Sequence, residues 1–282
     1  GCREPSVLLI TGKGAETRQK RGTEYIDTPS DVDYVQSFLQ EYDVRHGLDG
    51  MEKVRSLLSI LPILKRDEGR TVVVKYGGSA LGAEAATDTT LQDVAALRMV
   101  GVRVVLVHGG GKHITALLDK LQVPTRFENG YRYTDQAVLE TAEMALSAQV
   151  NKAIVSRLSQ LEVSAVGLSG KDGGLLTAVE KDPALGRVGS ITRVEPRILQ
   201  TLLDGDFLPV VSPIAAGEDG GGFNCNADDA ARAVAAALGA DKLIFLTDTA
   251  GVLIDSHNSK TAVPHMDVKR AEELIDTGLI AG

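Results

Sequence analysis

Runs of consecutive apolar residues that end in glycine clusters limit the folds open to this chain more than any other feature. The apolar run 72–74 leads into Gly77 and Gly78, and the run 104–107 leads into Gly109, Gly110 and Gly111. Strands that are apolar at consecutive positions are typical of parallel sheets buried on both faces. Glycines just beyond them are typical of turns from a strand into a helix.

The rest of the chain repeats this alternation of apolar runs and helical periodicity. Strands are expected at 6–11, 71–75, 102–108, 164–168, 207–213 and 242–247. Helices are expected at 51–65, 90–100, 112–121, 135–160, 195–203, 228–238 and 268–276. Alternating strands and helices predict an α/β fold, a three-layer αβα sandwich with a mainly parallel central sheet.

Composition excludes several classes of protein. No apolar run approaches the length that spans a bilayer, and hydrophobic residues make up 43% of the 282 residues. The net charge is -8, which is the wrong sign for a general nucleic-acid or membrane-surface binder, so no partner of either kind is expected. Because Cys2 and Cys225 cannot build a disulfide framework and no secretory signal opens the chain, we expect a cytoplasmic location.

The first part of the chain has a different character from the rest. Residues 17–43 are rich in charge, and Ser30 or Asp31 fits the N-cap of a helix. A boundary is therefore expected near 44–50, with one domain at 1–50 and a second at 51–282.

Two glycine loops are candidates for binding anions. Lys75 ends an apolar strand just before Gly77 and Gly78, which fits a phosphate site, although an ordinary turn after a surface lysine explains the pattern equally well. The run of three glycines from Gly109 opens a helix and favours an anion held on backbone N–H groups over a plain turn. His108 beside it is expected to be a packed residue rather than a base.

Further polar residues follow other strands. Asn224 and Asp228 flank the start of an alanine-rich helix, where an N-cap with acidic residues in the first turn is at least as good an explanation as a binding site. Cys225 has no histidine at a suitable spacing and is not expected to be a nucleophile. Arg132 suits a carboxylate, although a lone loop arginine is usually solvated. Because the carboxyl ends of parallel strands meet at one edge, these loops predict one shared crevice.

Six segments, taken together and in order along the chain, indicate a protein family far more specifically than any one of them does alone. They read KYGGSAL at 75–81, HGGG at 108–111, NGYRYTD at 129–135, GLSGKDGGLLTA at 167–178, FNCNADDAA at 223–231 and LTDTAGVL at 246–253. Over residues 51–282 the chain thus resembles the amino-acid kinase family, and within it the acetylglutamate kinases. The resemblance implies transfer of the γ-phosphoryl group of ATP, with Mg²⁺, to the side-chain carboxylate of N-acetyl-L-glutamate in arginine biosynthesis.

The resemblance implies that residues 51–282 comprise an acceptor-binding lobe to about residue 203 and then a nucleotide-binding lobe. It also implies roles for matching residues. Lys75 would stabilise the transferring phosphoryl group, and Asp228 would orient the catalytic lysines. The phosphates would lie on Gly77 and Gly78. The acceptor would be held by Gly110, Gly111, Arg132 and Asn224. The adenosine site would be lined by Asp248, Thr249, Ala250, Gly251, Val252, Leu253, Leu279, Ile280 and Ala281. No protein ligand for the metal is implied.

The chain departs from the family pattern in two places. In most relatives a segment with a second phosphate-neutralising lysine follows the position of Gly282, so we expect an incomplete nucleotide-binding lobe or an inactive protein. Lys112 stands where many relatives have proline.

Residues 7–17 are similar to the carboxyl-terminal end of MurE-type Mur ligases, with Ala15 in place of a histidine. This segment is expected to be a ligase remnant, the alternative being an unrelated strand and helix.

Other functions remain open at this point. The same fold could phosphorylate another carboxylate, of the aminoadipate type or from cell-wall metabolism. A regulatory module that binds nucleotide or arginine without turnover is the non-enzymatic alternative. The helix at 51–65 resembles one that builds hexamers in arginine-inhibited relatives, which predicts a homo-oligomer, a dimer or hexamer, although packing on its own domain explains the same pattern.

Overall fold

The computed structural model describes residues 65–77, 89–128, 130–246, 251–255, 258 and 261–279, residue 37, and the backbone of 18–21 and 24–27. Contacts group the chain into two compact units, Gly1–Arg66 and Asp67–Gly282. In the first, β1 (Arg18–Arg21) and β2 (Glu24–Asp27) form an antiparallel hairpin. The expected strand at 6–11, the ligase-like segment at 7–17 and nearly all of the expected helix at 51–65 lie outside the described residues.

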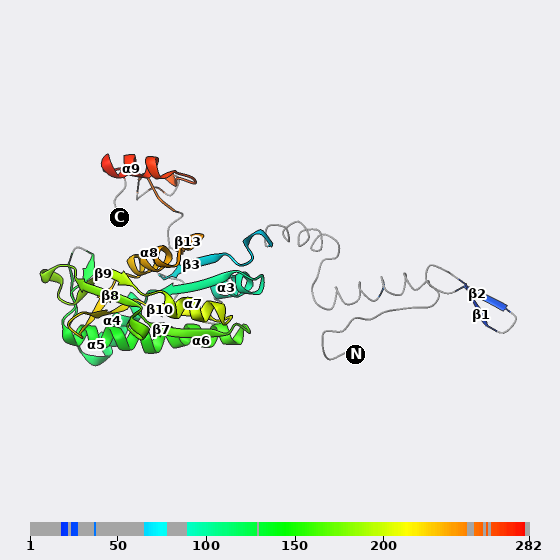
Figure 1. Ribbon diagram of the computed structural model, residues 1–282, viewed down its shortest axis with the longest axis horizontal. Helices are drawn as coiled ribbons and strands as arrows, with labels where there is room; N and C mark the ends of the chain where they lie inside the picture. Colours follow the sequence, from blue (N-terminus) through cyan, green and yellow to red (C-terminus); the bar gives the residue numbers. More distant parts are fainter. Residues whose placement is uncertain are drawn as a thin grey trace. The chain divides into compact units, whose positions relative to one another are not determined.

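A five-stranded parallel sheet forms the centre of the second unit (Figure 1). Its strands are β3 (Thr71–Tyr76), β4 (Arg103–His108), β7 (Ala165–Ser169), β10 (Leu208–Ser212) and β13 (Lys242–Phe245). Their order across the sheet is β13-β3-β4-β10-β7, and every neighbouring pair is parallel. The five strands predicted in this unit are confirmed to within two residues at each end.

Helices cover both faces of this sheet. On one face Val72, Val74 and Leu106 pack against α3 (Thr89–Met99) and α6 (Asn151–Gln160). The alternate strand residues, among them Val73, Val105 and Val107, pack on the other face against α7 (Arg197–Asp204) and α8 (Ala227–Leu238). Because successive side chains of a strand point to opposite faces, an apolar run supplies both cores at once. The predicted three-layer sandwich is confirmed.

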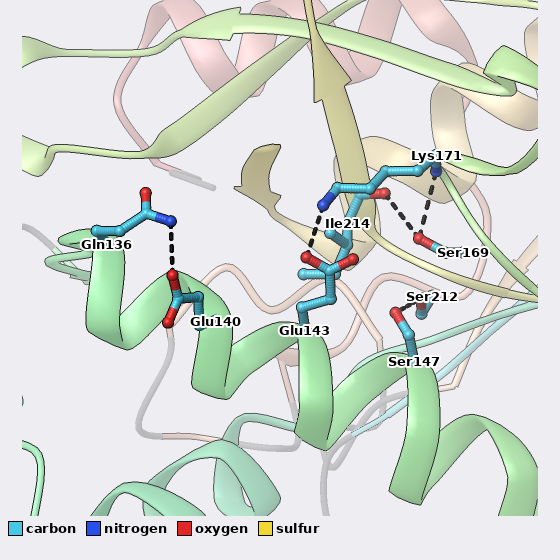
Figure 2. Close-up of polar contacts among 8 residues, drawn as sticks. All are labelled: Gln136, Glu140, Glu143, Ser147, Ser169, Lys171, Ser212 and Ile214. Atoms are coloured by element: carbon cyan, nitrogen blue, oxygen red, sulfur yellow. Dashed lines mark hydrogen bonds and ion pairs between the residues drawn. The ribbon is translucent and has the colours of Figure 1, made fainter. Parts of the chain in front are cut away.

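The helix predicted at 135–160 is one continuous helical stretch with a π-helical turn inside it. It consists of α5 (Gln136–Glu143), the π-helix η3 (Met144–Val150) and α6. Figure 2 shows two polar contacts of this stretch: Lys171, in the loop after β7, lies 2.6 Å from a carboxylate oxygen of Glu143, and the hydroxyls of Ser147 and of Ser212 in β10 are 2.8 Å apart. π-Turns are often found at functional sites.

A small four-stranded barrel beside the sheet was not predicted. Its strands are β8 (Leu176–Glu180), β9 (Val188–Val194), β11 (Ile214–Gly217) and β12 (Gly222–Cys225), in the order β11-β12-β9-β8. A hairpin of β5 (Phe127–Glu128) and β6 (Tyr131–Arg132) was also missed. Two short 3₁₀ turns lie at Asp172–Gly174 and Pro183–Leu185.

We expect Gly189→Ala to destabilise the barrel. An added Cβ would lie 2.6 Å from Cβ of Phe223 and 2.9 Å from Sγ of Cys225, closer than such atoms approach. Overpacking of this kind lowers the free energy of unfolding by about 2 kcal/mol. Urea denaturation measures the change, with Ser190→Ala on the same strand as the control. Equal stability of the two variants would contradict the tight packing at Gly189.

The remaining helices follow their predicted positions. The helix α4 (Gly111–Leu121) begins one residue earlier than predicted, and α9 (Val268–Asp276) has the predicted bounds. Asp267 caps α9, because its carboxylate accepts a hydrogen bond from the backbone N–H of Arg270 at 2.7 Å. Among the described residues, no helix is both long enough and apolar enough to cross a membrane.

Candidate active site

Lys75 and Asp228 form an ion pair at the carboxyl end of the sheet. Lys75 is the fifth residue of β3, and its Nζ lies 3.1 Å from Oδ1 of Asp228 in the first turn of α8. Asn226 caps α8 by accepting hydrogen bonds from the backbone N–H groups of Asp228 and Asp229. The predicted N-cap is therefore confirmed, and the same helix start brings a carboxylate to the lysine.

The glycines near this pair let the backbone approach the ammonium group closely. A Cβ on Gly77 would lie 3.0 Å from Nζ of Lys75, and a Cβ on Gly109 would lie 3.8 Å from Cβ of Ala227. The loops after β3 and β4 and the start of α8 therefore converge, as the predicted shared crevice requires. Gly78, the second predicted phosphate residue of this loop, lies outside the described residues.

The start of α4 is open to an anion. Gly110 is its N-cap residue, and no side chain caps the helix there. The first N–H groups of a helix have no partner within the helix, and the helix dipole makes them attractive to negative charge. A side chain at Gly110 would crowd η3, since an added Cβ would lie 2.6 Å from Cδ2 of Leu146.

The four residues predicted to bind the acceptor line one cavity of about 390 Å³. Gly110 and Gly111 come from the start of α4, Arg132 from β6 and Asn224 from β12. Lys112 lines the same cavity, so the positive charge it adds lies at this site. The structure thus brings together residues more than a hundred positions apart in the sequence.

Arg132 is built into the wall of this cavity and is not a solvated loop residue. It is 7% exposed, and its guanidinium donates to Oγ1 of Thr125 and Oγ1 of Thr115, each at 2.7 Å, and to the carbonyl of Gly111 at 3.1 Å. Burial lowers the pKa of Arg132, and the nearby carboxylate of Asp119 opposes this shift. An arginine held in this way presents a fixed cation to a ligand.

Lys181 is a neighbouring residue that sequence reasoning missed. Its Nζ lies 4.6 Å from the centre of the Tyr131 ring, which lines the cavity, and 3.7 Å from Oδ2 of Asp229. A hydrogen bond with Tyr131 is the main cause that raises the pKa of Lys181, and Asp229 raises it further. Because Lys181 follows β8, a strand that was not predicted, nothing in the sequence placed it near the cavity.

Cys225 and His108 were not expected to act as a nucleophile and a base, and their surroundings agree. Burial raises the pKa of the Cys225 thiol to about 12, so the thiol stays protonated at neutral pH. His108 is completely buried, which confirms it as a packed residue. Among the described residues, no group of three or more His, Cys, Asp or Glu side chains could hold a metal ion.

The state of His108 predicts how stability depends on pH. Burial lowers its pKa from 6.5 to about 4, although a hydrogen bond to the Gly109 carbonyl opposes the shift; His113 and Lys152 lower it further. Between these two values the unfolded chain binds the proton and the folded chain does not. The free energy of unfolding should therefore fall by up to about 3 kcal/mol as the pH is lowered from about 6.5 towards 4.

Urea denaturation from pH 8 to pH 4 measures this dependence. The His108→Asn variant lacks the titrating ring, so the difference in stability between wild type and variant should shrink as the pH falls. A difference that stays constant over this range would contradict the buried neutral state of His108.

Part of the predicted adenosine site can be located in the chain. The carbonyl of Val252 accepts a hydrogen bond from the backbone of Val263 at 2.9 Å, and Leu253 forms a bridge with Ala262. Gly251 precedes them, and Leu279 follows α9, its N–H donating to the carbonyl of Leu274. The other predicted residues lie outside the described ones: Asp248, Thr249, Ala250, Ile280 and Ala281.

Comparison with known proteins identifies the family. Residues 70–282 match the amino acid kinase family. The chain belongs to this family. Acetylglutamate kinase of Nostoc punctiforme is 46% identical over 231 residues, which is 82% of this chain and 78% of the relative. That of Campylobacter jejuni subsp. doylei is 44% identical over 224 residues, 79% of this chain and 80% of the relative. The resemblance to acetylglutamate kinases is confirmed, whereas the resemblance to Mur ligases stays a prediction.

Solved structures show the same amino acid kinase fold. A protein from Streptococcus mutans UA159 aligns with a TM-score of 0.65 and 31% identity, over 75% of this chain and 84% of that one. N-acetylglutamate synthase from Neisseria gonorrhoeae, complexed with coenzyme A and N-acetylglutamate, aligns with a TM-score of 0.66 and 23% identity, over 79% of this chain and 51% of that one. The second likeness concerns the fold alone.

Proposed function

We propose that this amino acid kinase transfers the γ-phosphoryl group of ATP to the side-chain carboxylate of N-acetyl-L-glutamate, giving N-acetylglutamyl 5-phosphate. One observation carries the choice of acceptor: a single cavity contains both a buried arginine, Arg132, and the uncapped start of α4 at Gly110 and Gly111. N-acetylglutamate has two carboxylates, so two anion sites in one cavity suit it. Relatives that are named acetylglutamate kinase support the same choice.

The residues present suit chemistry that needs no general base. A carboxylate acceptor is already ionised at neutral pH, so the site has only to position it and to neutralise the charge of the phosphoryl group. Lys75 would contact the transferring group, with its ammonium held by Asp228. Gly110 and Gly111 would bind the reacting carboxylate, and Arg132 with Asn224 would bind the α-carboxylate.

Membership of the kinase family implies the use of ATP. We propose Mg²⁺ as the accompanying ion, held mainly by phosphate oxygens and water, which is how this ion usually binds in kinases. The ion would neutralise phosphate charge. Gly77 and Gly78 would contact the phosphates, and the segments around Gly251 and Leu279 would line the adenosine site.

The oligomeric state and the location complete the proposal. We expect a homo-oligomer, a dimer or a hexamer, in the cytoplasm. Light scattering on the chain in solution measures its mass, and a particle near the monomer mass of 29.8 kDa would contradict the oligomer.

Trapping of the acyl phosphate tests the proposed reaction. Hydroxylamine converts an acyl phosphate to a hydroxamate, so ATP, Mg²⁺ and N-acetyl-L-glutamate should give N-acetylglutamyl hydroxamate. N-acetyl-L-glutamine, which lacks the acceptor carboxylate, is the matched control and should give none. Faster product formation from aminoadipate would indicate another acceptor. Nucleotide binding without any product would indicate a regulatory module.

A further inference from the structure

His108 lies directly beside the candidate acceptor loop but has no contact with the cavity surface. It is the last residue of β4, it is 0% exposed, and Gly109, Gly110 and Gly111 follow it. Its Nδ1 lies 2.9 Å from the carbonyl oxygen of Gly109. Its Nε2 lies 3.1 Å from Nδ2 of Asn151.

These two partners determine which ring nitrogen carries the proton. A carbonyl oxygen can only accept, so Nδ1 must donate to Gly109. The amide nitrogen of Asn151 also lies 2.9 Å from the carbonyl of Val210 and 3.3 Å from that of Leu168, which fixes it as a donor. Nε2 of His108 must therefore accept, and the ring is neutral with its proton on Nδ1.

Asn151, on the helical stretch that packs against the sheet, holds the ring in place. It is completely buried at the junction of η3 and α6, and its side chain contacts residues of β4, β7 and β10. An added Cβ on Gly167 would lie 1.9 Å from Oδ1 of Asn151, so only glycine at this position of β7 leaves room for the amide. The orientation of the imidazole is thus set by Asn151, whose amide is itself held by backbone carbonyls of β7 and β10.

The hydrogen bond to Gly109 also determines the direction of the next N–H group. The carbonyl of Gly109 and the N–H of Gly110 belong to one planar peptide group, and no cis peptide bond is found among the described residues. In a trans peptide these two groups point in opposite directions. With the Gly109 oxygen held on the side of the buried ring, the Gly110 N–H points away from it, and Gly110 lines the acceptor cavity.

We infer that His108 is a positioning residue for the acceptor carboxylate, which acts through the Gly109–Gly110 peptide group by holding its carbonyl so that the Gly110 N–H faces the cavity. His108 neither touches the substrate nor transfers a proton. The inference rests on the proposed function, since it concerns the loop that would bind the reacting carboxylate.

Two substitutions separate this role from simple packing. An asparagine amide nitrogen lies close to the place of imidazole Nδ1, and a glutamine amide nitrogen lies close to that of Nε2. His108→Asn should therefore keep the donor to Gly109, whereas His108→Gln should lose it. We expect kcat/KM for N-acetylglutamate to fall by about 10- to 100-fold in His108→Gln. It should stay near the wild-type value in His108→Asn, with the KM for ATP unchanged in both variants.

A purely structural role gives a different result. Both variants would then lose activity alike, in proportion to their loss of thermal stability, and this outcome would overturn the inference. So would a fully active His108→Gln variant. If the wild type formed no acyl phosphate at all, the proposed function would fail on its own account.

Nuclear magnetic resonance tests the geometry without activity. The ¹⁵N spectrum of the His108 ring at pH 7 should show the neutral form with hydrogen on Nδ1, and the Gly110 amide resonance should shift in His108→Gln more than in His108→Asn. A ring protonated on Nε2, or a Gly110 resonance equally affected by both substitutions, would overturn the inference even in an inactive protein.

Discussion

Lys75→Ala is expected to lower kcat for acyl phosphate formation by about 100- to 1000-fold, since a charge contact to the transferring group is worth most in the transition state. The lysine ammonium lies at the carboxyl end of β3, 3.1 Å from Asp228, and its side chain is 14% exposed. The hydroxamate assay at saturating ATP and N-acetylglutamate measures the effect, and the KM for each substrate should change far less than kcat.

Lys242→Ala is the matched control for this prediction. Lys242 begins the adjacent strand β13, and its ammonium lies 3.1 Å from Asp67. Its removal takes away the same charge from the same sheet, so kcat should stay near the wild-type value. If both variants were equally slow, a general effect of charge or stability would replace the proposed role of Lys75. If neither were slow, the mechanism would be wrong.

The central sheet could be predicted because most of its strands are apolar at consecutive positions, and this pattern is visible in the sequence. In β4 the last five of six residues are buried, and the alternate ones serve opposite cores, so the strand must be apolar at nearly every position. A short run of consecutive apolar residues is typical of a buried strand of a parallel sheet. Of the helices that cover the sheet, α6, α7 and α8 were predicted equally well, because each shows an apolar stripe of helical period. In α3 the buried residues are only Leu91, Val94 and Ala95, so its signal is weaker.

The barrel and the π-turn could not be predicted, because neither leaves a distinct pattern in the local sequence. The strand β12 has only four residues, and it pairs with β9, more than thirty residues earlier in the chain. Pairing over such a distance leaves no local periodicity. The π-turn η3 lies inside a stretch that has a helical pattern on both sides of it, so the sequence predicts a helix there but not its altered hydrogen bonding.

The candidate site was predictable in its residue types and not in its geometry. Glycines after strands and a basic residue in a loop indicate anion binding from the sequence alone. That Arg132 is buried and bound to two threonines depends on the hairpin of β5 and β6, which was missed. The role of Asn151 leaves no pattern in the sequence, because its partners are backbone carbonyls of two strands and a buried ring.

Arg132→Ala is expected to raise the KM for N-acetylglutamate by about 100-fold or more, since it leaves a carboxylate without its buried partner in the wall of the cavity. The KM for ATP and the value of kcat should change much less, because the contact would hold the α-carboxylate in ground and transition states alike. Initial rates over a range of acceptor concentrations give both constants. Arg132→Lys should recover only part of the loss, because an ammonium cannot form the forked pair of hydrogen bonds.

Arg126→Ala, just before the same hairpin, is the matched control, and it tests whether the effect comes from direct binding or from net charge. Arg132 and Arg126 are both cations close to an aromatic ring, with their guanidinium groups 4.6 Å from the centre of Phe127 and 3.7 Å from the centre of Tyr133. The side chain of Arg126, however, is 61% exposed, and it pairs with Glu128 at 2.8 Å. Its removal changes the net charge by the same amount, so an unchanged KM would show that long-range attraction is not the cause. A rise in KM of equal size in both variants would instead indicate electrostatic steering of the acceptor. Direct binding by the Arg132 guanidinium would then have to be abandoned.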